Sequence, residues 1–407
     1  MPNFIILIHV FRFTTHNCDD VDSLGVARIA LGGDSATRRE TVVKATPHVV
    51  VAMPYVLVFN PGNPDTETLV YIQTTFNESS TLVIWSTKQQ AVTKRIASSY
   101  PAVFSTFVQP KLVTFPSLDG EFTIHAQLFD TGASTGGPTA GDKKPGVIFT
   151  HGGCQRQMYA AFHYAADYAG LYALNQFLAA RGHVVLSVNY RGGPGYGVRF
   201  RAANGSGWQG ASEYQDTLGG AKFLQSLANV DPDRIGIHGL SYGGLNAMQA
   251  VSRNSDVFKA SVANAPVVNW ITQLRYEGAG NPFNLLSDPD HGQLFRALPT
   301  GPGGFMTSPA WLGYTQANQQ LAWASSPAAN LDAITSPLLL IQGDSDANVD
   351  FAETVGVVRS LRARGFDKLE TLMVPDDTHG FSKFANQLAA AAATEAFLTK
   401  VLKPVAR

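Results

Sequence analysis

The distribution of apolar and polar positions divides the chain into two parts. Up to about residue 110, short runs rich in Val, Ile, Thr and Phe alternate with turn-like clusters, as in HVVVAMPYVLVF followed by NPGNPDTE. Short β-branched and aromatic runs bounded by Gly, Pro, Asn and Asp are typical of antiparallel strands joined by tight connections. We therefore predict an all-β N-terminal region over residues 1–110.

From residue 111 onward, continuous apolar runs alternate with stretches of helical length. The apolar runs are GVIFTH, HVVLSVNY, RIGIHG, PLLLIQG and LETLMVP. Helical stretches include EYQDTLGGAKFLQSLA, SYGGLNAMQAVSRN and AETVGVVRSLRARG. This alternation indicates a mostly parallel sheet flanked by helices, so we predict an α/β domain over residues 111–407. The irregular segment Glu277–Phe305 is predicted to cover one end of the sheet.

Charge and composition exclude several classes of function. Thirty Lys and Arg residues stand against 31 Asp and Glu residues, and the formal net charge is −1. Nucleic-acid partners are not expected, because their binding surfaces carry a marked excess of positive charge. Two cysteines, Cys18 and Cys154, are too few for a disulfide framework, and the ten histidines form no HExxH. No metal or other cofactor is predicted.

The N-terminal stretch MPNFIILIHVFRF has a short apolar core from Phe4 to Val10. It lacks preceding basic residues and a following small-residue cleavage site, so we interpret it as a strand rather than a secretory signal. It is too short to span a bilayer, and no membrane partner is expected. By default the protein is placed in the cytoplasm. Unpaired strand edges in the N-terminal region would allow a homo-oligomer.

Candidate chemistry begins with the segment DRIGIHGLSYGG. Ser241 lies between Gly239 and Gly243, directly after an apolar run and before a helical stretch. A G-x-S-x-G pattern in a strand–turn–helix context is typical of a nucleophile elbow. The helix N-terminus would also favour a developing negative charge beside the serine. The alternative is a Gly-rich turn with an incidental serine.

A nucleophilic serine needs a base, and the base needs a group that orients it. In this arrangement the chain order is Ser, then an acid after a later strand, then His after the last strand. The loop after PLLLIQG carries Asp344, Asp346 and Asp350, and the loop after LETLMVP carries Asp376, Asp377 and His379. Asp350 is interpreted as a helix N-cap. The order of these residues after successive strands predicts a Ser-Asp-His triad but leaves open which aspartate takes part.

Several blocks, among them HGG, NYRGGPGYG, DPDRIGIHGLSYGG and FKASVANAPVVNW, resemble the prolyl oligopeptidase family of serine peptidases. The resemblance runs from about Val113 to Leu402, is greatest for bacterial enzymes of the dipeptidyl peptidase IV type, and implies an α/β-hydrolase fold. The family pattern G-x-x-D-x-x-V falls on Gly343, Asp346 and Val349. The resemblance therefore implies a triad of Ser241, Asp346 and His379.

The resemblance also implies an oxyanion hole and a substrate side. Oxyanion donors would be the backbone N–H of Tyr242 and a backbone amide at Gly152 or Gly153, since His151 stands where some members have tyrosine. Candidate substrate-binding residues are Trp270, Tyr276, Asn348 and His151. The aromatic residues among them could equally belong to the core. Cys154 replaces a family proline, and a packing role is favoured for its thiol.

The N-terminal part departs from the family, which carries a full β-propeller there. The roughly 110 residues present would accommodate about two blades. Three interpretations stay open: a propeller remnant, a β-extension packed on the α/β domain, or an interface that pairs with a second chain. The acidic residues with which dipeptidyl peptidases hold a free amine have no recognisable counterpart. The main hypothesis is an acyl-enzyme serine peptidase acting on short peptides. A carboxylesterase with the same triad is the alternative, because the site would be open, and a non-catalytic interaction protein with a vestigial triad is a third.

Overall fold

The computed structural model describes the backbone of residues 5–11, 23–30, 38–44, 49–58, 68–86, 89, 91–97, 102–132, 143–273 and 316–403, and side chains from Tyr71 onward within these ranges. Two compact units make up the chain. The first comprises Met1–Leu112 and Tyr159–Gln176, and the second comprises Val113–Met158 and Phe177–Arg407. Helix α1 (Ala166–Ala180) contains one of the boundaries. The predicted insertion at Glu277–Phe305 and Cys18 lie outside the described residues.

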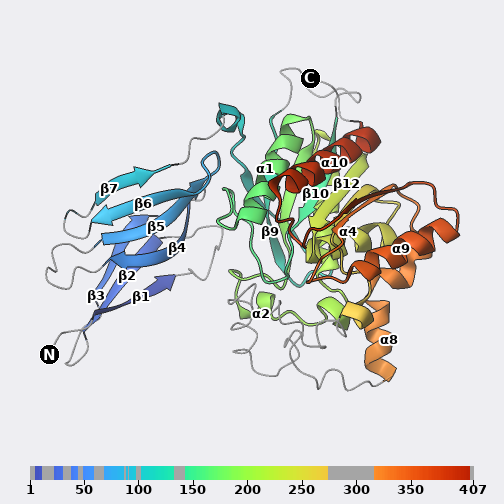
Figure 1. Ribbon diagram of the computed structural model, residues 1–407, viewed down its shortest axis with the longest axis horizontal. Coiled ribbons are helices and arrows are strands. Elements are labelled where there is room, and N and C mark those ends of the chain that lie inside the picture. Colours follow the sequence, from blue (N-terminus) through green and yellow to red (C-terminus); the bar gives the residue numbers. More distant parts are fainter. Residues whose placement is uncertain are drawn as a thin grey trace. The chain divides into compact units, whose positions relative to one another are not determined.

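The first unit contains two antiparallel sheets, as the short apolar runs predict (Figure 1). One sheet has the order β1-β2-β3 and the other the order β4-β5-β6-β7. The strands are β1 (Ile5–Phe11), β2 (Ser23–Ala30), β3 (Arg38–Lys44), β4 (Val49–Val58), β5 (Thr68–Thr75), β6 (Thr81–Ser86) and β7 (Ala91–Ile96). The strand predicted at the N-terminal apolar run is confirmed as β1. A four-stranded antiparallel sheet in chain order is also the architecture of one propeller blade.

Residues Tyr159–Gln176 belong to the first unit through hydrogen bonds that the hydrophobic pattern does not reveal. The Thr74 hydroxyl donates to the carbonyl of Phe162 at 2.6 Å, and the Tyr172 hydroxyl donates to the carbonyl of Phe76 at 2.9 Å. The 3₁₀ helix η2 (Ala102–Thr106) precedes Val108, whose amide and carbonyl both bind the side chain of Gln176. These contacts hold a distant segment against the antiparallel strands.

The second unit is built on an eight-stranded sheet of order β15-β14-β13-β12-β10-β11-β9-β8. Its strands are β8 (Lys111–Pro116), β9 (Thr123–Phe129), β10 (Lys144–Thr150), β11 (Val184–Asn189), β12 (Val230–Leu240), β13 (Phe258–Asn264), β14 (Leu338–Gly343) and β15 (Leu369–Val374). From β11 to β15 all neighbours are parallel, and β9 is antiparallel to β11. Every residue of β10, β11 and β14 is buried, which explains their continuous apolar runs. The predicted mostly parallel sheet is confirmed.

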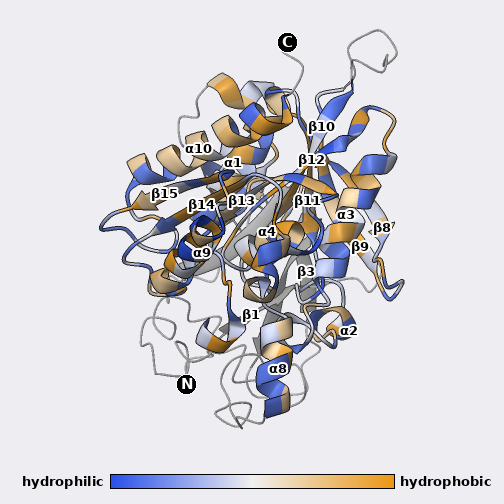
Figure 2. Ribbon diagram, turned by 90° about the vertical axis from the view of Figure 1, so that its right-hand side faces the viewer, coloured by the Kyte–Doolittle hydropathy of each residue, from blue (hydrophilic) through white to orange (hydrophobic). Residues whose placement is uncertain are grey.

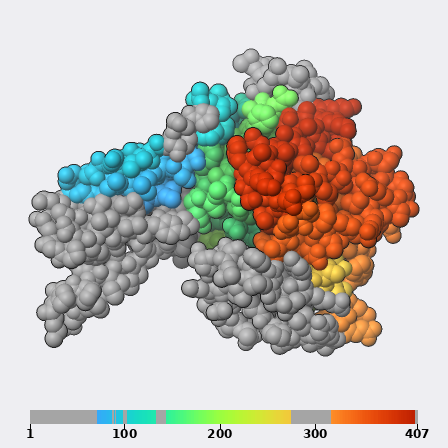
Figure 3. All heavy atoms as spheres, in the orientation of Figure 1, coloured from blue at the N-terminus to red at the C-terminus, as the bar shows by residue number. Residues whose placement is uncertain are grey.

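Helices cover both faces of this sheet (Figure 2). The helices that have not yet been given bounds are α2 (Val198–Arg201), η3 (Gly207–Gln209), α3 (Tyr214–Ser226), α4 (Tyr242–Arg253), α8 (Gln316–Ala324), η4 (Pro327–Ala333), α9 (Phe351–Ala363) and α10 (Phe384–Leu402). A Cβ at Gly236 of β12 would lie 2.7 Å from Leu402 of α10, whereas a Cβ at Gly146 of β10 would meet Ile235 of β12 and Leu224 of α3. Because adjacent strand residues face opposite sides, α10 and α3 lie on opposite faces. The outer side of α10, in dark red, forms part of the surface in Figure 3.

The strand register brings several carboxyl ends to one edge of the sheet. Thr150 at the end of β10 pairs with Gly239 of β12, and Leu240 pairs with Asn264 at the end of β13. At the ends of β14 and β15, Gly343 pairs with Val374. Open α/β sheets place their sites at this edge. No helix within the described ranges is long and apolar enough to cross a membrane.

Candidate active site

Ser241 occupies the turn between β12 and α4. Its backbone has φ 63° and ψ −119°, in a region that non-glycine residues rarely adopt. The Ser241 amide donates to the carbonyl of Asn264 at 2.8 Å, which ties the turn to the neighbouring strand β13. A strained serine held between a strand end and a helix start matches the geometry of a nucleophile elbow.

The glycines around Ser241 are required by close backbone contacts. A Cβ at Gly243 would lie 2.0 Å from the carbonyl oxygen of Thr150, and one at Gly244 would lie 2.6 Å from that of Asn264. At Gly239, a Cβ would lie 2.4 Å from the carbonyl carbon of Gly243. No side chain fits at these distances, so the first turn of α4 can lie directly against the ends of β10 and β13.

The loop after β14 holds Asp346 in a dense set of donors. Its Oδ1 accepts the amides of Asn348 at 2.8 Å and Val349 at 3.0 Å, and its Oδ2 accepts from Gln342 Nε2 at 3.0 Å. His379 Nδ1 lies 2.8 Å from the same Oδ2. Burial tends to raise the pKa of Asp346, but the attraction of His379 and these hydrogen bonds hold it below its ordinary value. The carboxylate therefore remains ionised at neutral pH.

The structure distinguishes among the aspartates that the loop pattern left open. Asp344 is exposed, and its Oδ1 accepts the amide of Asp376 at 2.8 Å. Asp346, by contrast, has a fully buried side chain and contacts His379. The side chain of Asp350 accepts the amide of Ala352 at 2.9 Å at the start of α9, which confirms its predicted N-cap role.

Asp377 organises the loop that carries His379, a role that loop position alone did not suggest. Its Oδ1 accepts from the amides of Thr378 at 2.8 Å and Ser382 at 2.7 Å and from the Ser382 hydroxyl at 2.8 Å. Asn386 Nδ2 donates to the other oxygen at 2.7 Å. Although burial opposes the charge, these donors hold the pKa of Asp377 below its usual range. Several donors thus fix the histidine loop on one carboxylate.

The predicted oxyanion loop follows β10 and meets the serine turn directly. The hydroxyl of Thr150 donates to the carbonyl of Gly243 at 3.0 Å. His151 is completely buried, and burial lowers its pKa to about 4, so its imidazole is neutral at neutral pH. Gly152 is buried, and Gly153 is half-buried with φ 50°. Tyr242 begins α4, at the same edge of the sheet.

The predicted substrate-side residues are not all brought together. Trp270 is only 1% exposed and its ring packs 5.8 Å from that of Tyr242, so the indole lies in the core. Asn348 is half-buried beside Asp346, and its carbonyl accepts from the side chain of Gln273 at 2.8 Å. Cys154 is buried within the main apolar core. Tyr276 lies outside the described residues.

Potential metal ligands do not gather in the parts of the chain described above. Within those ranges there is no group of three or more His, Cys, Asp or Glu side chains that could hold a metal ion.

Solved structures with a similar fold include a puromycin hydrolase, with a TM-score of 0.69 and 19% identity over 93% of this chain and 52% of that chain. An acylaminoacyl peptidase from Pyrococcus horikoshii has a TM-score of 0.66 and 18% identity over 99% of this chain and 57% of that chain. Together with the sheet order, these likenesses show that the second unit has the α/β-hydrolase fold.

The chain belongs to the prolyl oligopeptidase family, whose profile it matches over residues 171–292 and 303–405. Dipeptidyl aminopeptidase BIII of Pseudoxanthomonas mexicana is 30% identical over 260 residues, which are 63% of this chain and 33% of that protein. Dipeptidyl peptidase 8 of Homo sapiens is 28% identical over 277 residues, which are 67% of this chain and 26% of that protein. The chain thus spans between a quarter and a third of the length of these curated relatives.

Proposed function

We propose that this protein is a serine peptidase that cleaves short peptides through an acyl-enzyme. One observation carries the proposal: the Nδ1 of His379 lies 2.8 Å from Asp346 Oδ2, while Ser241 occupies the strained turn at the carboxyl edge of the same sheet. With Nδ1 engaged by a carboxylate, Nε2 is the nitrogen that exchanges protons with the serine and the leaving group.

The proposed reaction has two halves. In the first, Ser241 Oγ attacks the peptide carbonyl carbon while its proton passes to His379 Nε2, and the C–N bond then breaks as Nε2 protonates the leaving amine. In the second, water attacks the ester carbon, gives a proton to Nε2, and Ser241 leaves with that proton. Asp346 holds the histidine in one tautomer and stabilises the imidazolium.

The charge on the carbonyl oxygen during each attack needs donors aimed at the tetrahedral intermediate. We assign this role to the backbone N–H of Tyr242 and to a backbone amide of the loop at Gly152 and Gly153. The position of Tyr242 at the start of α4 supports the assignment, because the first amides of a helix have no acceptor within the helix. Loss of one such donor typically lowers kcat by about 10²–10³-fold.

Relatives support peptides as the substrate class. They include dipeptidyl peptidases and an acylamino-acid-releasing enzyme of Oryza sativa, which is 25% identical over 249 residues. The names of these proteins describe the release of dipeptides or of acylated amino acids, which differ in their N-terminal group. For this chain we propose short peptides without assigning either end group.

The test compares amide and ester cleavage by the full chain with that by Ser241→Ala. The panel contains Ala-Pro, Gly-Pro and N-acylated single-residue p-nitroanilides beside short-chain p-nitrophenyl esters. We expect anilide cleavage that falls by at least about 10³-fold in the Ser241→Ala variant. Serine-dependent cleavage of esters alone would instead identify a carboxylesterase, and equal activity of the two proteins would contradict a serine mechanism altogether.

A further inference from the structure

Three aromatic rings connect the two parts of the proposed oxyanion hole. The imidazole of His151 is stacked on the ring of Tyr190, with 4.3 Å between centroids and 16° between planes. Tyr190 in turn is stacked with Tyr242 at 6.0 Å and 12°. The Tyr190 hydroxyl also donates to the carbonyl of His151 at 2.6 Å. The ring stack His151–Tyr190–Tyr242 therefore runs from the loop after β10 to the residue that follows Ser241.

Glu213 holds the Tyr242 end of this ring stack. It directly precedes α3 and is only 1% exposed. Its Oε1 accepts the Tyr242 hydroxyl at 2.8 Å, and its Oε2 accepts the amide of Gly207 at 3.0 Å. Burial raises the pKa of Glu213, and the nearby charge of Asp216 adds to this rise. Burial of this carboxyl is energetically costly. Its structural effect is to fix the hydroxyl end of the Tyr242 side chain.

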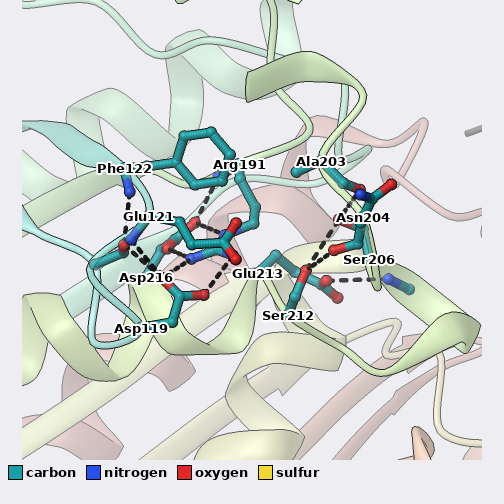
Figure 4. A network of polar contacts seen from close by, with 12 residues as sticks. Asp119, Glu121, Phe122, Arg191, Ala203, Asn204, Ser206, Ser212, Glu213 and Asp216 are labelled. Atoms are coloured by element: carbon teal, nitrogen blue, oxygen red, sulfur yellow. Dashed lines mark hydrogen bonds and ion pairs between the residues drawn. The ribbon is translucent and has the colours of Figure 1, made fainter. Parts of the chain in front are cut away.

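The start of α3 also holds Tyr190, the middle residue of the ring stack. Arg191, the residue after Tyr190, donates its amide to Asp216 Oδ2 at 2.8 Å and its guanidinium to Asp216 Oδ1 at 2.6 Å. Figure 4 shows the guanidinium between the carboxylates of Asp216 and Asp119, with Glu213 close by. Glu213 and Asp216, at the start of α3, therefore hold Tyr242 directly and Tyr190 through Arg191.

We propose that Glu213 is a positioning residue for the oxyanion hole, acting through the Tyr242 hydroxyl. Anchoring the tyrosine at both ends fixes the orientation of the peptide unit whose N–H meets the oxyanion, and the ring stack carries the same constraint to the loop of Gly152 and Gly153. Small displacements of such donors have large effects on rate. The inference rests on the proposed serine hydrolase chemistry and adds a residue to it.

The test removes the anchor without removing the ring. Tyr242→Phe deletes the hydroxyl and keeps the stacked ring, whereas Glu213→Ala deletes the carboxyl. Tyr214→Phe is the matched control. Tyr214 is the first residue of α3, and its hydroxyl donates to Asn254 Oδ1 at 2.8 Å, away from the ring stack. Each protein is assayed for thermal stability, for kcat and KM, and for the rate at which a fluorophosphonate labels Ser241. The phosphonyl oxygen of this probe occupies the oxyanion hole, so the labelling rate reports on its geometry without a known substrate.

We expect Tyr242→Phe to lower both kcat and the labelling rate by about tenfold, with KM within about twofold, because the donor is displaced rather than lost. Glu213→Ala should have an effect at least as large. Tyr214→Phe should lose a similar amount of stability and keep its labelling rate. Equal labelling rates for Tyr242→Phe and Tyr214→Phe would overturn the role of Glu213 while leaving the serine mechanism intact. Absence of labelling in the unmodified protein would overturn both proposals.

Discussion

The two sides of the proposed site are held in different ways. On the triad side, Asp346 and Asp377 each accept several donors from their own loops, and both carboxyls have pKa values below their usual range. On the oxyanion side, Glu213 is buried and accepts hydrogen bonds that include those of Gly207 and Tyr242, yet its pKa is raised. Desolvation opposes ionisation of all three carboxyls, and the balance between burial and hydrogen-bond donors sets the direction of each shift.

This difference indicates what each side contributes. The donors on Asp346 and Asp377 come mostly from residues within a few positions along the chain, so these loops are organised locally. The oxyanion side depends on contacts between the ends of β10 and β11 and the starts of α3 and α4, which are distant in sequence. Substitutions on the triad side should therefore change the chemistry more than the fold, and substitutions on the oxyanion side should affect both.

The largest expected effect is that of Asp346→Asn. The substitution keeps the size of the side chain but removes the charge that faces His379 Nδ1, so it favours the wrong tautomer. We expect kcat to fall by about 10⁴-fold, the loss that follows when the orienting acid of a triad is amidated. Steady-state kinetics on the best substrate of the panel would measure the effect.

Asp344→Asn serves as the control for Asp346→Asn, because it makes the same change two residues away at an exposed side chain. Its kcat should stay within about threefold of that of the unmodified protein. Comparable losses in both variants would mean that the loop as a whole, rather than the Asp346–His379 contact, supports activity.

Gly243→Ala should differ from Asp346→Asn, because it should lower the stability of the fold and not the catalytic rate alone. Its Cβ would lie 2.0 Å from the carbonyl oxygen of Thr150, a backbone atom that cannot move aside without shifting β10. We expect a destabilisation of about 3 kcal/mol or more, at or beyond the upper end of ordinary overpacking. Urea unfolding followed by circular dichroism would measure it.

Gly356→Ala in α9 is the matched control for Gly243→Ala, since nothing lies within 4 Å of a Cβ at that position. It should stabilise the protein by about 0.5–1 kcal/mol, because alanine is the better helix former. If Gly243→Ala were tolerated equally well, the close approach of α4 to β10 could not be what requires glycine in the serine turn.

The parts of the structure that could be predicted are those with local signals. Apolar runs predicted β10, β11 and β14 correctly, because a strand buried on both faces has few polar positions. Apolar runs also predicted β12 and β15, although part of each strand is exposed. Because the ends of these apolar runs could be located, the positions of Ser241, Asp346 and His379 just after strand ends could be predicted as well. Spacing alone could not choose between Asp344 and Asp346, which differ in burial rather than in sequence context.

The contacts that could not be predicted join residues far apart in sequence. The hydrogen bond from Tyr190 to His151 spans 39 positions, and that from Tyr242 to Glu213 spans 29. Hydrophobicity gave no means of distinguishing a pocket residue from a core residue at Trp270, and the structure places its ring in the core. Such roles depend on tertiary packing, which leaves no period or motif along the chain.

The pKa of Glu353 shows whether the direction of a carboxyl's shift depends on its side of the site or on its own surroundings. It lies on α9, just after the loop of Asp346, yet burial raises its pKa from 4.5 to about 6. Its Oε2 accepts the amides of Val268 at 2.6 Å and Asn269 at 3.0 Å, and the Thr272 hydroxyl donates to its Oε1. Although it belongs to the triad side of the chain, Glu353 resembles Glu213 in the direction of its pKa shift.

The sign of the pH effect follows from that shift. A carboxyl with a raised pKa in the folded state binds its proton more tightly there, so its contribution to stability is complete below about pH 4.5 and is lost as the pH rises through about 6. Relative to Glu353→Gln, which keeps an acceptor and cannot ionise, the unmodified protein should lose up to about 2 kcal/mol of unfolding free energy over this range. Urea unfolding of both proteins at about pH 4.5 and about pH 7.5 measures the difference. A difference that stayed constant, or that changed in favour of the unmodified protein at the higher pH, would show that the three donors outweigh burial and that Glu353 behaves like Asp346 instead.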